Sequence, residues 1–266
     1  MPIRDFVVYY GQGPLPGLER YDVAVLEPRG WTRQALMDLR RTGVRVLAYL
    51  SVLEVAEWEL ASTGLAAGDL LRIDGQPWQR PQFDTVVVDP RSERWRRHLE
   101  GRTADLVAAG WDGLFVDGLG DLEDPLVSGQ LAWLLPAAAT LMAALGAHSA
   151  GRLVVMNNGI WSILPWVAAY LDAVCWEVDE APTAVGDAHI GAALDRLAGE
   201  AVRHGLGRWL LSVVPEGAPD GERRRAAFTA FATSMGFLSY VAPCDYAQGI
   251  RTLDGDVRRA PGPGRR

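Results

Sequence analysis

The chain has 266 residues, 49% of them hydrophobic and 22% charged, a globular composition that excludes wholesale disorder. Its 33 acidic side chains outnumber the 26 basic ones and give a net charge of −7, which argues against nucleic acid as a partner. All 26 basic residues are arginines, so the composition excludes chemistry that requires a lysine, such as Schiff-base catalysis, lysine-anchored pyridoxal phosphate or a P-loop.

Eight short apolar segments follow one another along the chain, and a helical pattern follows most of them. The segments are nearly continuous in hydrophobicity rather than alternating, which is typical of strands that are buried on both faces of a parallel sheet. The predicted strands are 6–10, 23–26, 44–51, 113–117, 153–157, 173–178, 209–214 and 237–241.

The segments between these strands carry helix signals. Thr32 is a predicted N-cap, and Gly43 stands where a left-handed C-terminal cap belongs. Ser92 is the predicted cap of a second helix. The stretch 52–90 contains several Gly and Pro, and a loop this long inside a compact domain is usually functional. The predicted helices are 32–42, 92–109, 130–145, 160–170, 190–204 and 222–234.

Eight strand–helix units in about 250 residues predict a (β/α)8 TIM barrel of the α/β class. The alternative is an open doubly wound sheet, which usually shows a glycine-rich fingerprint after its first strand. Here the turn GQGPLPG has Pro16 where the third glycine of that fingerprint belongs. We therefore predict one barrel domain over residues 1–250 and a frayed tail over residues 251–266.

Catalytic groups in such a barrel lie at the carboxyl ends of the strands. Carboxylates that converge there without Lys or His suit general acid–base and nucleophilic work on a neutral, hydroxyl-rich substrate. Five of the eight strand ends carry such a group, namely Glu27, Glu54, Asp117, Glu177 and Glu216.

Asp117 and Glu177 are the strongest candidates. Asp117 follows four core residues of its strand, so its side chain should emerge at the barrel mouth. Glu177 lies beside Trp176, and desolvation there should raise its pKa, which suits a proton donor. Asp121, four residues after Asp117, either binds a sugar hydroxyl or turns the loop.

Other polar and aromatic residues near the strand ends are candidates for substrate binding. Asn157 and Asn158 can recognise hydroxyl groups, although Asn158 with Gly159 also fits a turn. Glu54 either binds a hydroxyl, orients a catalytic neighbour or is a loop acid. Aromatic faces stack on sugar rings but also pack in cores. The aromatic candidates are Tyr10, Trp58, Trp78, Trp161 and Tyr240.

Histidine and cysteine give no sign of a metal site, because their spacing fits no metal-ligand motif. The sequence thus predicts no cofactor, and it favours buried thiols over a disulfide at Cys175 and Cys244. The sequence shows no signal peptide and no membrane span, which predicts a cytoplasmic chain as written, or a secreted one if it was trimmed. The oligomeric state stays open.

Several segments resemble a known family. The segment 109–121 (AGWDGLFVDGLGD) is the most specific of them, and the resemblance covers residues 6–240. The family is glycoside hydrolase family 114, the endo-α-1,4-polygalactosaminidase-like group of (β/α)8 barrels. The other matching segments are 46–54 (VLAYLSVLE), 89–99 (DPRSERWRRHL), 154–159 (VVMNNG) and 172–178 (DAVCWEV).

The resemblance implies a carbohydrate substrate and hydrolysis of an α-glycosidic bond, in a galactosamine-containing polymer for example. It assigns the two catalytic acids to Asp117 and Glu177, and it makes Glu54 the acidic residue after the third strand. Asp117 would be the nucleophile and Glu177 the general acid and then base, with retention of configuration by family analogy.

Two alternatives remain. The first is a barrel that binds glycans without turnover, because Leu53 stands where the family commonly has glycine before Glu54. The second is a metal-dependent enzyme with Asp117, Glu177 and Glu54 as oxygen ligands.

Overall fold

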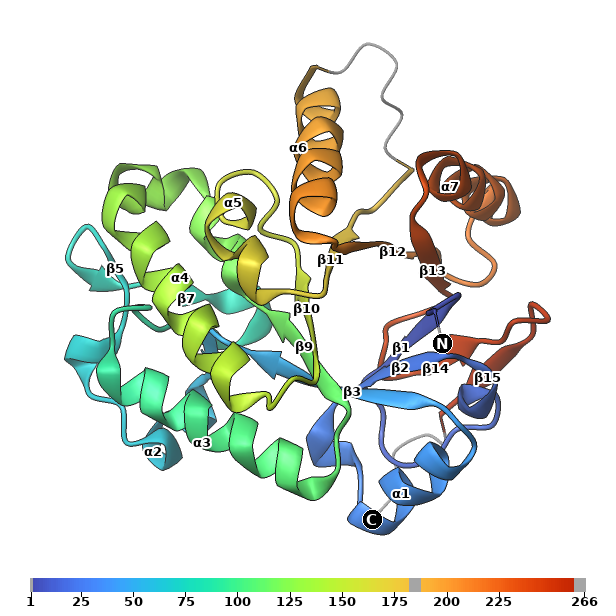
Figure 1. The fold of residues 1–266 in the computed structure, drawn as a ribbon, viewed down its shortest axis with the longest axis horizontal. Helices are drawn as coiled ribbons and strands as arrows, with labels where there is room; N and C mark the ends of the chain where they lie inside the picture. Colours follow the sequence, from blue (N-terminus) through green and yellow to red (C-terminus); the bar gives the residue numbers. More distant parts are fainter. Residues whose placement is uncertain (1, 182–187, 261–266) are drawn as a thin grey trace.

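The computed structural model describes residues 2–181 and 188–260. Eight parallel strands form one sheet, and its two edge strands pack against each other, so the predicted barrel is confirmed as nearly closed (Figure 1). In sheet order the strands are β1 (Phe6–Tyr9), β2 (Val23–Leu26), β3 (Arg45–Ser51), β9 (Gly113–Asp117), β10 (Leu153–Asn157), β11 (Ala173–Glu177), β12 (Gly207–Val213) and β13 (Leu238–Ala242).

The barrel core explains why these segments become strands. Every residue of β1 and β2 is buried, as their unbroken apolar sequences require. Inside the barrel, the Phe6 ring stacks on Trp209 with a centroid distance of 4.5 Å. This packing joins the first and seventh barrel strands across the interior.

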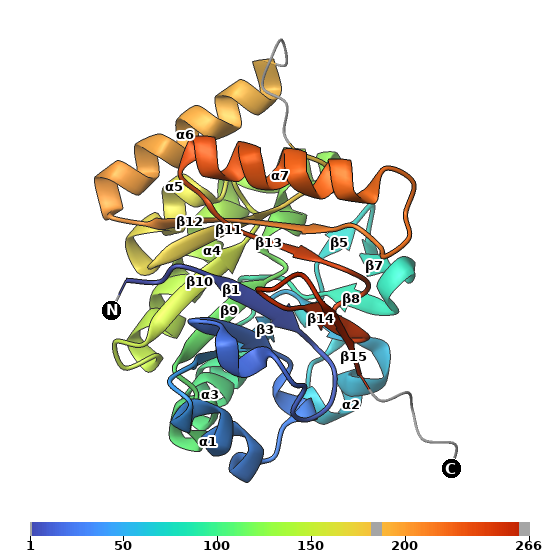
Figure 2. The same ribbon diagram turned by 90° about the vertical axis from the view of Figure 1, so that its right-hand side faces the viewer.

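Helices cover the outside of the barrel; Figure 2 shows α6 and α7 lying outside β11, β12 and β13. The predicted caps are present: Thr32 accepts a hydrogen bond from Ala35 N (3.2 Å), and Ser92 accepts one from Trp95 N (3.0 Å). The α-helices are α1 (Arg33–Arg41), α2 (Leu60–Thr63), α3 (Glu93–Ala109), α4 (Leu131–His148), α5 (Leu164–Val167), α6 (Ala188–His204) and α7 (Gly221–Met235). The 3-10 helices are η1 (Leu18–Arg20), η2 (Pro28–Gly30), η3 (Glu57–Glu59), η4 (Ala67–Asp69), η5 (Pro81–Phe83), η6 (Leu119–Glu123), η7 (Pro125–Gln130) and η8 (Ala168–Tyr170).

The helix predicted over residues 160–170 is shorter than expected. The Glu123 carboxylate accepts hydrogen bonds from the backbone N–H groups of Ser162 and Ile163, which draws those donors out of a helical ladder. Pro165 then fits the first turn of α5, because its missing N–H has no partner to lose there.

The long segment after β3 is an insertion with its own small sheet. Strand β4 (Glu54–Ala56) pairs antiparallel with β8 (Thr85–Val87), which also pairs with β7 (Gln79–Arg80). Strands β5 (Arg72–Ile73) and β6 (Gln76–Pro77) form a second ladder. Because the insertion leaves β3 at its carboxyl end, it stands beside the barrel mouth.

The expectation of a frayed tail from residue 251 is wrong as far as residue 259. Strand β14 (Gly249–Arg251) pairs antiparallel with β15 (Val257–Arg259), and Figure 2 shows this hairpin beside β1. Ile250 of this hairpin is fully buried, which gives the hairpin an anchor that a frayed tail lacks. Residues 261–266 lie outside the described part of the chain.

Helix α4 and the 3-10 turn before it form the most apolar helical stretch. By length and mean hydropathy (1.5), the segment Pro125–His148 could cross a membrane. In the structure it packs against α3 and α5 as an outer helix of the barrel, with Leu134, Leu141 and Leu145 buried. Helices that pack within a soluble fold can pass the same test of length and composition.

Both cysteines are buried as free thiols, Cys175 on β11 and Cys244 after β13.

Candidate active site

Three neighbouring strands bring three polar side chains together at the barrel mouth. Asp117 ends β9, Asn157 ends β10, and Glu177 ends β11. The ladders β9–β10 and β10–β11 are parallel, so the three strand ends meet on one side of the sheet. The side chains line a cavity of about 780 Å³.

Asn157 connects the two carboxylates. Its Nδ2 donates hydrogen bonds to Asp117 Oδ1 (3.2 Å) and to Glu177 Oε2 (2.9 Å). Because both oxygens bond to one nitrogen atom, Asp117 Oδ1 and Glu177 Oε2 lie no more than roughly 6 Å apart. The amide therefore fixes the separation and the orientation of the acid pair.

The outer oxygen of each carboxylate accepts a hydrogen bond from a tyrosine. Tyr49 donates to Asp117 Oδ2 (3.1 Å), and Tyr246 donates to Glu177 Oε1 (2.6 Å). The Tyr10 ring packs against both tyrosines, at centroid distances of 4.7 and 5.4 Å. Burial and the nearby carboxylates raise the pKa of Tyr49 and of Tyr246, so both hydroxyls stay protonated and donate.

Asp117 has a raised pKa of about 6. Burial is the main cause and the charge of Glu177 adds to it, because both disfavour the ionised form. Hydrogen bonds from Gly118 N–H, Asn157 and Tyr49 act in the opposite direction and stabilise the carboxylate. Asp117 is thus a poorly solvated carboxylate that ionises near neutral pH.

A second acid pair lies beside the first. Asp121 accepts a hydrogen bond from Arg80 (2.9 Å), which reaches it from the insertion. The pKa of Asp121 is raised to about 8. Burial is the largest cause, and a hydrogen bond to Glu54 and the charge of Glu54 add to it. Glu54 also accepts a hydrogen bond from Thr85. At neutral pH, the Asp121 carboxyl therefore keeps its proton and shares it in the hydrogen bond to Glu54.

The shared proton predicts a pH-dependent difference in stability between the wild type and Asp121→Asn. An unfolded Asp ionises near 3.8, whereas folded Asp121 keeps its proton to about pH 8, so the wild type loses stability as the pH rises between these values. Asparagine keeps the donor to Glu54 and the acceptor for Arg80 at every pH. The melting temperature of Asp121→Asn should therefore rise relative to that of the wild type from pH 5 to pH 8. If the difference between the two melting temperatures stayed constant from pH 5 to pH 8, the proton on Asp121 would be contradicted.

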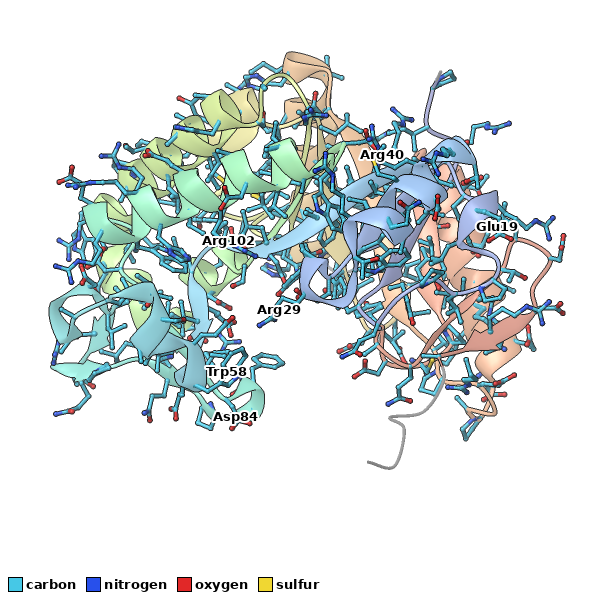
Figure 3. All side chains as sticks on the ribbon, turned by 90° about the horizontal axis from the view of Figure 1, so that it is seen from below. Glu19, Arg29, Arg40, Trp58, Asp84 and Arg102 are labelled. Carbon is cyan, nitrogen blue, oxygen red and sulfur yellow. The ribbon has the colours of Figure 1, made fainter. Side chains whose placement is uncertain are left out.

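The structure places most of the predicted binding residues at the cavity. Glu54, Asp121, Asn157, Asn158 and Trp161 line it. Figure 3 views the side chains from below, with Arg29, another lining residue, labelled. The two catalytic candidates lie within one hydrogen-bonded group, as described above.

Tyr10 and Tyr240, by contrast, do not line the cavity. The Tyr10 ring packs against those of Tyr49 and Tyr246, and burial followed by the charge of Asp117 raises the pKa of its hydroxyl. Tyr240 is buried: its hydroxyl accepts a hydrogen bond from Arg251 N (3.1 Å), and its ring packs edge-on against Tyr21. It holds the C-terminal hairpin rather than a substrate.

Asn158 forms the turn that its sequence allows, and its side chain lines the cavity. Its backbone is in the left-handed region (φ 58°), as expected for a turn with Gly159. Its Oδ1 accepts a hydrogen bond from the backbone N–H of Glu177 (3.0 Å). The turn therefore fixes the backbone of Glu177 while it lines the cavity.

Of the remaining aromatic candidates, Trp161 packs edge-on against Trp176 and stacks on His189. Trp78 is buried beneath the insertion, whereas Trp58 is 72% exposed. The other two strand-end acids have structural partners: Glu27 caps η2 and pairs with Arg29, and Glu216 pairs with Arg259.

Sequence reasoning missed three residues of the site: Tyr49, Arg80 and Tyr246. Tyr49 lies on β3 two residues before Ser51, on the same side of the strand, and this alternation was an available signal. Tyr246 follows the last barrel strand at its carboxyl end, so it could have been read as a mouth residue. Nothing in the local sequence indicates that Arg80 reaches Asp121.

The metal-dependent alternative requires a cluster of ligand side chains, and the described residues contain none. Within residues 2–181 and 188–260, no three His, Cys, Asp or Glu side chains are grouped so that they could hold a metal ion. Asn157 Nδ2, a donor, lies between Asp117 and Glu177. Glu54 is engaged by Thr85.

Comparison with solved structures supports this architecture. The glycoside hydrolase domain of PelA from Pseudomonas aeruginosa has a TM-score of 0.73 and 24% identity, over 92% of this chain and 97% of that one. Aspergillus fumigatus Ega3, in a complex with galactosamine, has a TM-score of 0.70 and 14% identity over 90% of this chain and 92% of that one. The α-galactosidase TtGalA from Thermus thermophilus has a TM-score of 0.57 and 13% identity, over 90% of this chain and 58% of that one.

No curated protein sequence matches the chain significantly. The model of glycoside-hydrolase family GH114, however, matches residues 6–182, which include Glu54, Asp117, Asn157 and Glu177. This match covers more than half of the chain and all three polar strand ends of the cavity. The chain therefore belongs to glycoside-hydrolase family GH114.

Proposed function

We propose that the protein hydrolyses α-linked glycans that contain amino sugars of the galactosamine type, with retention of configuration. The observation that carries the proposal is the Asp117–Asn157–Glu177 group, in which one amide holds two carboxylates within roughly 6 Å. A short spacing of this kind is typical of retaining glycosidases, in which one carboxylate attacks directly, and it supports the proposed retention.

In the first step, a carboxylate oxygen of Asp117 attacks the anomeric carbon. The bond to the leaving oxygen breaks, and that oxygen takes a proton from Glu177. In the second step, Glu177 removes a proton from water, and the water oxygen attacks the anomeric carbon and releases Asp117. Three hydrogen-bond donors favour the ionised form of Asp117 that the first step requires.

The charge of the cavity supports an amino-sugar substrate. Two guanidinium groups line it, those of Arg29 and Arg80, against a larger number of carboxylates, so an ammonium group finds complementary charge there. The related Ega3 structure contains galactosamine. The lining carboxylates are Glu54, Glu59, Asp117, Asp121, Glu123, Asp124 and Glu177.

Product analysis tests the substrate. The protein would be incubated with partially deacetylated α-1,4-galactosamine oligomers and with neutral α-linked galactose and glucose oligomers, with the Asp117→Asn protein as the matched control. We expect shortened oligomers only from the amino-sugar substrates and only with the wild type. Cleavage restricted to neutral glycans would contradict the amino-sugar assignment. Affinity without any product would favour the glycan-binding alternative.

The pH profile tests the role of Asp117. A nucleophile must be ionised, so kcat/KM should fall as the pH drops through about 6. Tyr49→Phe removes a donor that stabilises the carboxylate, and it should move this acid limb upward by about one pH unit. Tyr170→Phe, which changes an exposed tyrosine on η8, is the control and should leave the limb in place. If activity instead fell as the pH rose through about 6, Asp117 would be the acid.

A further inference from the structure

The insertion exposes two large aromatic side chains at the same end of its sheet. Trp58 is 72% exposed and Phe83 is 60% exposed. Strands β4 and β8 pair with Ala56 opposite Thr85, and the next residues continue this pairing through a hydrogen bond from Glu57 N to Asp84 O (3.1 Å). Trp58, which follows β4, and Phe83, which precedes β8, therefore lie opposite each other just beyond the end of the ladder.

One of the two rings lines the cavity, and the other packs against a residue that lines it. Phe83 lines it, and Trp58 lies beside Arg29 and Glu59, which also line it. Figure 3 shows Arg29, Trp58 and Asp84 close together along one edge of the insertion. A glycan that leaves the acid pair along this wall would pass Asp121 and Arg80 before it reaches the two rings.

Guanidinium groups hold the rings in place. The Arg29 guanidinium lies 5.7 Å from the Trp58 ring, and the Arg80 guanidinium lies 5.7 Å from the Phe83 ring. Arg29 is fixed by ion pairs to Glu27 and Glu59, and Arg80 is fixed by its pair with Asp121. These cation–π contacts position each ring while most of its surface stays exposed.

Packing does not account for this exposure. Trp78, from the same insertion, is only 7% exposed, so the insertion buries a tryptophan where its fold requires one. Two exposed rings at one ladder end, next to a cavity, differ from the scattered apolar residues of an ordinary surface. Fixed aromatic faces of this kind suit the apolar C–H faces of pyranose rings.

We propose that Trp58 and Phe83 form an outlying sugar-binding subsite, which holds units of a glycan chain several positions away from the scissile bond. The inference rests on the proposed function and adds that the enzyme favours long chains. The contact is with the C–H face of the sugar ring, so it depends on chain length and not on the charge of each unit.

Kinetics against chain length test the subsite. We would measure kcat/KM on α-1,4-galactosamine oligomers of increasing length for the wild type, Trp58→Ala, Phe83→Ala and the double variant. Loss of one stacking contact should lower kcat/KM about tenfold on long chains, with a much smaller loss on chains too short to reach the rim. Trp166→Ala, an exposed tryptophan on α5 outside the cavity lining, is the matched control and should behave as the wild type at every length.

The outcomes separate the subsite from the proposed function. If the wild type cleaves the oligomers and the losses in Trp58→Ala and Phe83→Ala are equal at all lengths or absent, the subsite is overturned. If the wild type cleaves none of them, calorimetric titration with the longest oligomer decides. Affinity that falls in the double variant supports the subsite without the hydrolysis, and unchanged or absent affinity overturns it.

Discussion

Asp117→Asn is expected to lower kcat by at least about 10³-fold on every cleaved glycan, because the substitution removes the attacking oxygen. Asparagine matches the shape of aspartate, so the variant should fold and bind substrate as the wild type does. Initial rates on the best substrate, together with melting curves and substrate titration of the same preparations, measure the effect.

Asp112→Asn is the matched control for this substitution. Asp112 lies before β9, where it pairs with Arg40 and accepts a hydrogen bond from Val46 N (3.0 Å), far from the strand ends that form the cavity. This variant should lose stability but keep its turnover number. Near-normal turnover in Asp117→Asn would remove Asp117 from the reaction.

Glu177→Gln is expected to lower kcat on natural glycans by about 10²–10⁴-fold, because a poor leaving oxygen needs a proton as it departs. An aryl glycoside with an acidic phenol leaves without that proton, so its first step should be much less affected. Added azide can replace the activated water of the second step, and it should restore turnover and yield a glycosyl azide. Rates with both substrate types, with and without azide, measure these effects.

Asp117→Asn serves as the comparison for this rescue, because the configuration of the glycosyl azide separates the two roles. Azide that replaces the water of the second step gives the α-azide, whereas azide that attacks in place of Asp117 gives the β-azide. An equal loss on both substrate types without rescue would contradict the acid–base role of Glu177. An α-azide from Asp117→Asn, or a β-azide from Glu177→Gln, would mean that the two roles are not divided as proposed.

The barrel was predictable because its strands carry a strong and local signal. Residues such as those of β1 and β2 are buried without exception, and a continuous apolar run has few other uses. Asp117, Asn157 and Glu177 could be brought together by the topology rule alone, since each ends a parallel strand. These parts of the site depend only on strand order.

The supporting contacts depend on distances that no local pattern encodes. Tyr246 reaches Glu177 from the connection between β13 and β14, across a separation of 69 residues in the chain. Arg80 reaches Asp121 through an antiparallel insertion whose strands are two or three residues long. The sequence predicted Tyr240 as a substrate-binding residue. A sequence cannot distinguish a tyrosine hydroxyl that binds a sugar from one that, like that of Tyr240, accepts a hydrogen bond from a backbone N–H.

The pKa of Asp117 also depends on three-dimensional packing. Burial and, after it, the charge of Glu177 raise the pKa of Asp117 to about 6. Neither cause can be read from the residues that flank Asp117 in the chain.

The configuration of the first-formed product tests the central claim most directly. Proton NMR of the anomeric signal would be followed from the first minutes of hydrolysis, before mutarotation mixes the anomers. The close Asp117–Glu177 pair predicts that the α-anomer appears first. Initial release of the β-anomer would contradict attack by Asp117 and require a water molecule between the two carboxylates.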